Sequence, residues 1–196
     1  MQYAIGRTFD INNPGWVIGT KENGSKIFLH QRLLVNKIKQ DDNSESIVIS
    51  DSLYAGIRCK IPLDFYGRSH LVKPEKSTVQ IQLLRASIVI NGEKYNIKNT
   101  LKNTGKPYYI GHPIFQQSIY MPDNYFAESK GGSKFARTWF PVVSDGKIQA
   151  YLHIGKVSKG CLTIILREND IWTNIYSKLI SSRLNKKFLC IVTTSF

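Results

Sequence analysis

The chain contains few cysteines and no long apolar run. Its three cysteines, Cys59, Cys161 and Cys190, form neither a CxxC pair nor a histidine-spaced set of metal ligands. We therefore expect no disulfide framework, no structural zinc and no metal site. The apolar runs are far too short to span a bilayer, so we expect no membrane span. The sequence has no internal repeat and no low-complexity tract.

Acidic residues are also scarce. Fourteen Asp and Glu stand against 27 Lys and Arg, for a net charge of +13. Such a field attracts polyanions, among them nucleic acids, anionic membranes and the bacterial wall. The lysines are scattered and form no arginine-rich stripe with stacking aromatics, so we expect no nucleic-acid partner. A solvated basic surface is the simpler interpretation of the charge.

Turn signals separate many short apolar runs, which is typical of β-hairpins. The Asn23-Gly24 pair predicts strands at residues 16–20 and 26–30, and Asn91-Gly92 predicts a second hairpin. Asp145-Gly146 predicts a third, in which the strand containing Trp139 pairs with the strand containing His153. His30 and His70, among turn and basic residues, are expected at the surface.

One helix is expected near the C-terminus, at about residues 169–184. Asn169 or Asp170 would cap it, and Arg183 with Asn185 would close it. Its apolar residues recur at helical spacing and are predicted to face the core: Ile171, Trp172, Ile175, Tyr176, Leu179 and Ile180. The expected fold is therefore mainly β with this helix packed on it. Residues 1–75 would be a β-rich extension or part of the same domain, followed by a domain at 76–196.

A thiol and a histidine lie between two strand-like runs. His153 and Cys161 stand eight residues apart, and two antiparallel strands joined by a loop would bring both to one sheet end. A thiol is mostly protonated near neutral pH, so a catalytic cysteine needs a base close by. Gly160 leaves room for a substrate carbonyl beside the sulfur. A core cysteine beside a hairpin histidine is the equal alternative; Cys59 and Cys190 are predicted to be inert.

The segment Ser158-Lys159-Gly160-Cys161 resembles the Ser-His-Gly-Cys signature of the L,D-transpeptidase catalytic domain, with His153 as the histidine of the preceding strand. The resemblance covers roughly residues 104–196, including the helix, turn and final strand after the cysteine. Two departures stand out. Lys159 replaces the second histidine, and Thr163 stands where an arginine or asparagine is common, which bears on recognition of a substrate carboxylate.

The resemblance implies a β-sandwich and a cysteine acyltransferase acting on peptidoglycan stem peptides without a cofactor. Cys161 would attack the donor carbonyl and expel D-alanine, and His153 would move the protons. Ser158, Lys159 and Gly160 would form the loop that supports the oxyanion. The acyl group would then pass to an amine, giving a cross-link or an exchanged D-amino acid, or to water, giving L,D-carboxypeptidase action.

Three further residues are candidates for binding the stem peptide. Arg137 would offer a bidentate fork to a substrate carboxylate if Thr163 does not bind it. Trp139 and Tyr151 would line the substrate site, although strand aromatics usually pack inward. A solvated arginine is the more common outcome for a residue such as Arg137.

The resemblance also implies a place of action in the bacterial cell envelope or periplasm. The first residues, Met1 to Arg7, contain no apolar signal core. We therefore expect a chain written without its leader or exported by a route that needs none, as for an antibacterial effector or toxin. Such a toxin would have an immunity or carrier protein as partner. The alternative is a noncatalytic basic β module that binds the wall or nucleic acid, in which Cys161 is structural.

Overall fold

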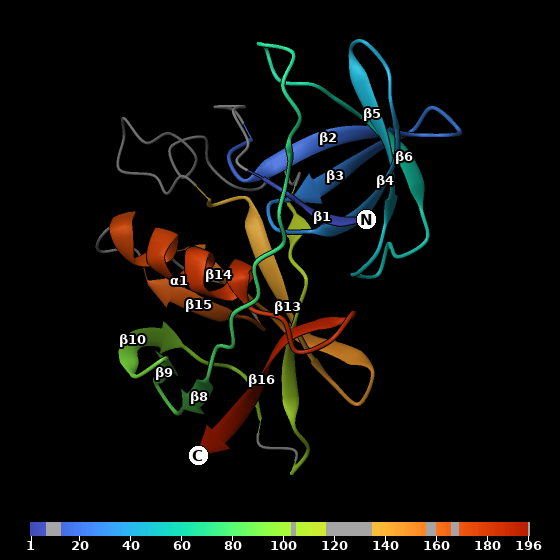
Figure 1. Cartoon of the computed structure of the whole chain (residues 1–196). Coiled ribbons are helices and arrows are strands. Elements are labelled where there is room, and N and C mark those ends of the chain that lie inside the picture. Colours follow the sequence, from blue (N-terminus) through green and yellow to red (C-terminus); the bar gives the residue numbers. More distant parts are fainter. Residues whose placement is uncertain (7–12, 103–104, 117–134, 156–159, 166–168, 196) are drawn as a thin grey trace. The chain divides into compact units, whose positions relative to one another are not determined.

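The computed structural model describes the chain except for residues 7–12, 103–104, 117–134, 156–159, 166–168 and 196. The chain forms two compact units, Met1–Lys76 and Ser77–Phe196 (Figure 1). This division lies one residue beyond the boundary expected from the sequence. Each hydrophobic core of the described residues draws its side chains from one unit only.

The first unit is a seven-stranded sheet with the strand order β3-β2-β6-β5-β4-β1-β7. All of its neighbouring pairs are antiparallel. Its strands are β1 (Gln2–Ile5), β2 (Trp16–Lys21), β3 (Lys26–His30), β4 (Leu34–Gln40), β5 (Ser44–Ile49), β6 (Arg58–Pro62) and β7 (Leu71–Val72). The expected surface position of His30 and His70 is wrong, because both are buried in this unit.

The second unit is a nine-stranded sheet with the order β11-β16-β8-β9-β10-β15-β14-β13-β12. A further pairing between β11 and β13 closes this sheet on itself. Its elements are β8 (Ile81–Leu84), β9 (Ser87–Ile90), β10 (Glu93–Lys98), β11 (Tyr108–Gly111), β12 (Ile114–Phe115), β13 (Thr138–Ser144), β14 (Lys147–Gly155), β15 (Leu162–Ile165), α1 (Asn169–Ser181) and β16 (Phe188–Ser195). The predicted mainly-β fold with a helix in the C-terminal region is confirmed.

The three predicted hairpins are all present. Asp145 (φ 53°) and Gly146 (φ 71°) both have positive φ and join β13 to β14. Asn91 (φ 50°) and Gly92 (φ 85°) join β9 to β10 in the same way. Two successive residues with positive φ fit the right-handed twist of the flanking strands, which explains the choice of Asn-Gly and Asp-Gly. Gly24 likewise turns β2 into β3.

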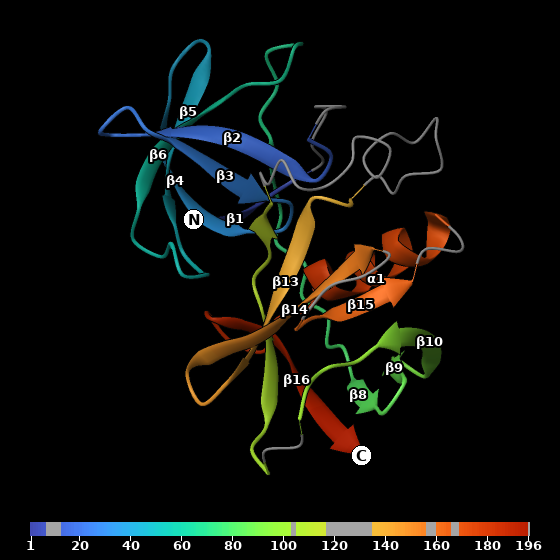
Figure 2. The same ribbon diagram turned by 180° about the vertical axis from the view of Figure 1, so that it is seen from behind.

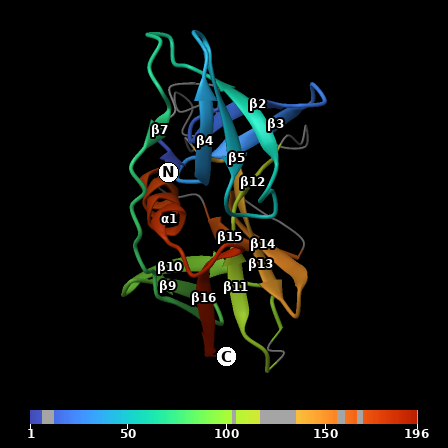
Figure 3. The same cartoon turned by 45° about the vertical axis from the view of Figure 1, so that its right-hand side comes forward.

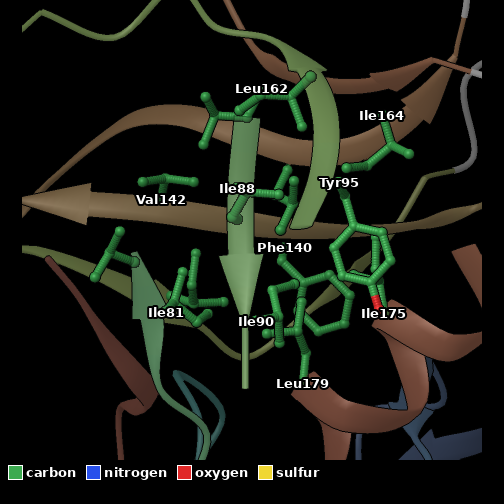
Figure 4. Packing of buried hydrophobic residues seen from close by; sticks show 14 of the residues in the cluster. Ile81, Ile88, Ile90, Tyr95, Phe140, Val142, Leu162, Ile164, Ile175 and Leu179 are labelled. Atoms are coloured by element: carbon green, nitrogen blue, oxygen red, sulfur yellow. The ribbon is translucent and has the colours of Figure 1, made fainter. Parts of the chain in front are cut away.

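Helix α1 packs its apolar residues against the strands of the second unit. Ile175 and Leu179 lie among Ile90, Tyr95 and Phe140 (Figure 4). The helix ends at Ser181, earlier than expected. There the backbone N–H and the Oγ of Ser77 both donate hydrogen bonds to the Ser181 carbonyl, at 3.2 and 2.8 Å, and so supply donors for a carbonyl of the last turn. The helix thereby covers the inner face of the sheet that carries the candidate site.

The burial of Leu179 in this packing predicts that its side chain contributes to the free energy of unfolding. Leu179 is fully buried, and replacing it with alanine would remove apolar contacts and leave a cavity. Leu179→Ala is therefore expected to lower the free energy of unfolding by about 2–5 kcal/mol, measured by urea denaturation. Leu184→Ala is the control, because Leu184 is half exposed; an equal loss in both variants would contradict the described packing.

No helix in the described part of the chain is long and apolar enough to cross a membrane.

Candidate active site

The strands that carry His153 and Cys161 are neighbours but run in the same direction. β14 and β15 form a parallel pair with His153 directly opposite Thr163 (Figure 2). The expectation of an antiparallel pair is therefore wrong. β15 starts at Leu162, which pairs with Leu152 of β14. Gly160, with φ 83°, and Cys161 directly precede it.

His153 and Thr163 lie on one face of this sheet, which we call the outer face. Side chains alternate along strands, and the core-facing residues here are Leu152, Ile154, Leu162 and Ile164. A Cβ placed on Gly155 would lie 3.6 Å from both His153 Cε1 and Thr163 Cγ2, which puts these two side chains on the same side. The outer face is thus distinct from the face that α1 covers.

The imidazole of His153 is held in a defined orientation. Its ring stacks on the indole of Trp139 from β13, with centroids 4.1 Å apart and an interplanar angle of 14°. Its Nδ1 lies 2.9 Å from the Ile154 carbonyl. A carbonyl only accepts, so Nδ1 carries the proton and Nε2 presents a lone pair when the ring is neutral. Nε2 makes no hydrogen bond with any residue that the structure describes.

Burial keeps this ring neutral. Only 2% of His153 is exposed, and desolvation lowers its pKa below the ordinary 6.5, while the hydrogen bond to the Ile154 carbonyl partly opposes that shift. Near pH 7 the side chain is therefore an uncharged imidazole with a free acceptor nitrogen. This is the protonation state that a general base requires.

Cys161 lies next to this base but is not hydrogen-bonded to it. It directly precedes β15 and stands two residues before Thr163, one strand away from His153. Strand spacing and rise put the two Cα atoms about 8 Å apart. Its side chain is 9% exposed and lies outside the main core cluster. The sulfur and Nε2 would have to approach further before a proton passes, as is common in unliganded sites.

The backbone of Cys161 is fixed from the opposite side of β15. Thr100 Oγ1 donates a hydrogen bond of 3.2 Å to the Cys161 carbonyl. Thr100 follows β10, which pairs with β15 through Lys98 and Thr163. Sequence reasoning missed this contact, because nothing in the pattern around Thr100 signals a partner 61 residues away.

The predicted substrate residues take different positions. Trp139 packs on His153, and Tyr151 lies near Trp139 at a centroid distance of 5.8 Å, so both aromatics belong to the outer face. The Arg137 guanidinium lies over the Phe115 ring, 5.8 Å from its centroid. Arg137 directly precedes β13, and when the register is followed from Cys161 it stands beyond His153. The structure does not bring Arg137 next to the thiol.

The predicted oxyanion loop is described only in part, because Ser158 and Lys159 lie outside the described residues. Gly160 is exposed, and a Cβ added to it would meet no atom of the described residues within 4 Å, its chain neighbours aside.

The other two thiols are in a different environment. Burial raises the pKa of Cys59 to about 11 and that of Cys190 to about 12. Both side chains pack in hydrophobic cores, so they are small apolar residues near neutral pH. Among the described residues, no group of three or more His, Cys, Asp or Glu side chains is placed to hold a metal ion.

These environments predict selective modification of one cysteine. Iodoacetamide at pH 7 is expected to label Cys161 in the folded protein well before Cys59 or Cys190, because thiolates react and the latter two are almost wholly protonated. Peptide mapping by mass spectrometry gives the order of labelling. Guanidinium should then expose all three thiols equally. Faster labelling of Cys59 or Cys190 would contradict the assignment.

Comparison of the chain with protein-family models, with curated proteins and with solved structures found no match.

Proposed function

We propose that the chain is a peptidoglycan-active cysteine acyltransferase of L,D-transpeptidase type. The observation that supports this most is the oriented, neutral His153, whose Nε2 has no partner among the described residues and which lies one strand away from Cys161. An unpaired buried nitrogen costs free energy, and a thiol or substrate proton that pairs with Nε2 would offset that cost. The signature-like segment ending at Cys161 adds independent support.

The chemistry follows from these two side chains. His153 Nε2 takes the proton from Cys161 Sγ as the sulfur attacks the carbonyl carbon of the donor stem peptide. The carbon–nitrogen bond then breaks, and the imidazolium returns its proton to the amine of the departing D-alanine. A thioester remains on Cys161. His153 next removes a proton from the acceptor, an amine or water, which displaces the sulfur.

The negative charge that develops on the carbonyl oxygen needs donors beside the sulfur. The backbone N–H groups of Gly160 and Cys161 stand next to the nucleophile, and the open side of Gly160 leaves room for the substrate. Desolvation of His153 strengthens such interactions, because charges are screened less away from water.

We place this activity in the bacterial cell envelope, where stem peptides occur. The net charge of +13 favours contact with a wall that carries carboxylates and phosphodiesters. A secreted antibacterial effector is the role that fits these features, and it would be kept in check by an immunity or carrier protein.

Mass spectrometry of muropeptides tests the proposal. Purified sacculi or tetrapeptide muropeptides are incubated with the protein, with Cys161→Ser and with Cys59→Ser as the matched control. We expect cross-linked, exchanged or trimmed stems with the wild type and with Cys59→Ser, and unchanged stems with Cys161→Ser. If no product forms with any of the three proteins, the noncatalytic basic module replaces the enzyme.

A further inference from the structure

An acyl donor of the proposed kind carries a carboxylate close to the bond that breaks. The departing D-alanine ends in a free carboxylate, one residue from the scissile carbonyl, and adjacent Cα atoms are about 3.8 Å apart. A cation that binds this group must therefore stand close to Cys161. Thr163 is uncharged, and Arg137 stands on the far side of His153.

Lys98 occupies the required position. It is the direct partner of Thr163 in the antiparallel pairing of β10 with β15; Figure 3 labels both strands in the second unit. Since Thr163 is in turn the partner of His153, Lys98 lies in line with the base on the outer face. The spacing between two neighbouring strands, combined with the rise of two residues along them, puts the Lys98 Cα about 8 Å from the Cys161 Cα.

The distances favour Lys98 over Arg137. Arg137 is two strands from β15, and in register it stands beyond His153 when counted from Cys161. Two strand spacings alone separate β13 from β15 by about 10 Å, before any offset along the strands is added. The Arg137 guanidinium is also engaged with the Phe115 ring.

The charge of Lys98 is available to a ligand. Its side chain is exposed, and it forms no ion pair with any residue that the structure describes. Thr100, two residues after Lys98, donates a hydrogen bond to the Cys161 carbonyl, which links the chain just beyond β10 to the backbone that carries the thiol.

We infer that Lys98 binds the terminal carboxylate of the acyl donor and so selects donors that end in a free D-amino acid. This inference rests on the proposed function. In it, Lys98 supplies the cation that the Thr163 position lacks, from the neighbouring strand. An ammonium group meets a carboxylate as a point charge and needs no bidentate geometry.

Steady-state kinetics on two donors tests the inference. One tetrapeptide ends in a free carboxylate and the other in a carboxamide, and both are used with the wild type, Lys98→Gln and Lys94→Gln. Lys94 is the matched control, since it is exposed on the same strand but pairs with Val89 of β9. We expect Lys98→Gln to raise KM for the acid donor about tenfold, with kcat changed less than about twofold and the amide donor unaffected. Lys98→Arg should restore most of the loss, and Lys94→Gln should resemble the wild type.

The outcomes separate this inference from the proposed function. Turnover by the wild type with an unchanged KM in Lys98→Gln, or with equal losses on both donors, would overturn the role of Lys98 alone. Absence of turnover by the wild type on either donor would overturn the proposed function and this inference with it. Melting temperatures of the variants exclude a loss of folding as the cause.

Discussion

Cys161→Ser is expected to lower the rate of stem-peptide transfer or hydrolysis by about a thousandfold or more. The serine hydroxyl keeps nearly the same size, but it is far less acidic than a thiol and far less nucleophilic. A neutral imidazole with a lowered pKa is a weak base, so it deprotonates a thiol much more readily than a hydroxyl. The measurement is the initial rate of muropeptide conversion, followed by chromatography and mass spectrometry.

The control for this variant is Cys59→Ser, in which an inert thiol of the first unit is replaced. It should keep the wild-type rate, and near-ultraviolet circular dichroism should show that both variants are folded. A fully active Cys161→Ser protein would mean that the sulfur takes no part in the chemistry.

His153→Gln is expected to slow the reaction by about 10²–10⁴-fold. Glutamine fills a similar space and offers an amide, yet it neither takes nor returns a proton. In the wild type, kcat/KM should rise with pH through a midpoint below 6.5, because burial lowers the pKa of His153 and only the neutral ring acts as a base. The pH–rate profile of His153→Gln should lack this acidic limb.

Trp139→Leu is a second test of whether the acidic midpoint of the kcat/KM profile comes from His153. Loss of the stacked indole would let water reach the imidazole and move its pKa up toward the ordinary value. The acidic limb should therefore shift to higher pH, while the variant stays active. An acidic limb in His153→Gln identical to that of the wild type would assign the titration to another group.

The lowered pKa of His153 also links stability to pH. Above pH 6.5 the ring is neutral in both states and has no effect. As pH falls below 6.5, the unfolded chain binds a proton that the folded protein does not, so stability falls until pH reaches the lower pKa of the folded state. Stability is thus lost between pH 6.5 and the lower pKa of the folded state, whereas activity is lost as pH falls through that lower pKa.

The local parts of this fold were predictable because short segments determine them. Asn91-Gly92 and Asp145-Gly146 supply the positive φ values that two-residue hairpins need. The hairpin signal at Asp145-Gly146 also predicted that the strand containing Trp139 pairs with the strand containing His153, as the register confirms. The apolar spacing from Ile171 to Ile180 likewise predicted α1 in its correct position.

The long-range pairings were not predictable from such signals. Parallel strands usually need a crossover of a dozen or more residues, so the short connection before Cys161 pointed to an antiparallel pair, which was wrong. The pairing of Lys98 with Thr163 joins segments 65 residues apart, and no sequence pattern around either residue predicts it. Only the register of the sheet therefore shows that four residues are aligned across neighbouring strands: Lys98, Thr163, His153 and Trp139.

The most direct measurement is the mass of the intact protein during turnover of a tetrapeptide donor. We expect the protein to gain the mass of the donor without its D-alanine, the added mass to map to Cys161, and hydroxylamine to remove it as it cleaves a thioester. Persistence of the unmodified mass under conditions where product forms, or an acyl group on any other residue, would contradict the account.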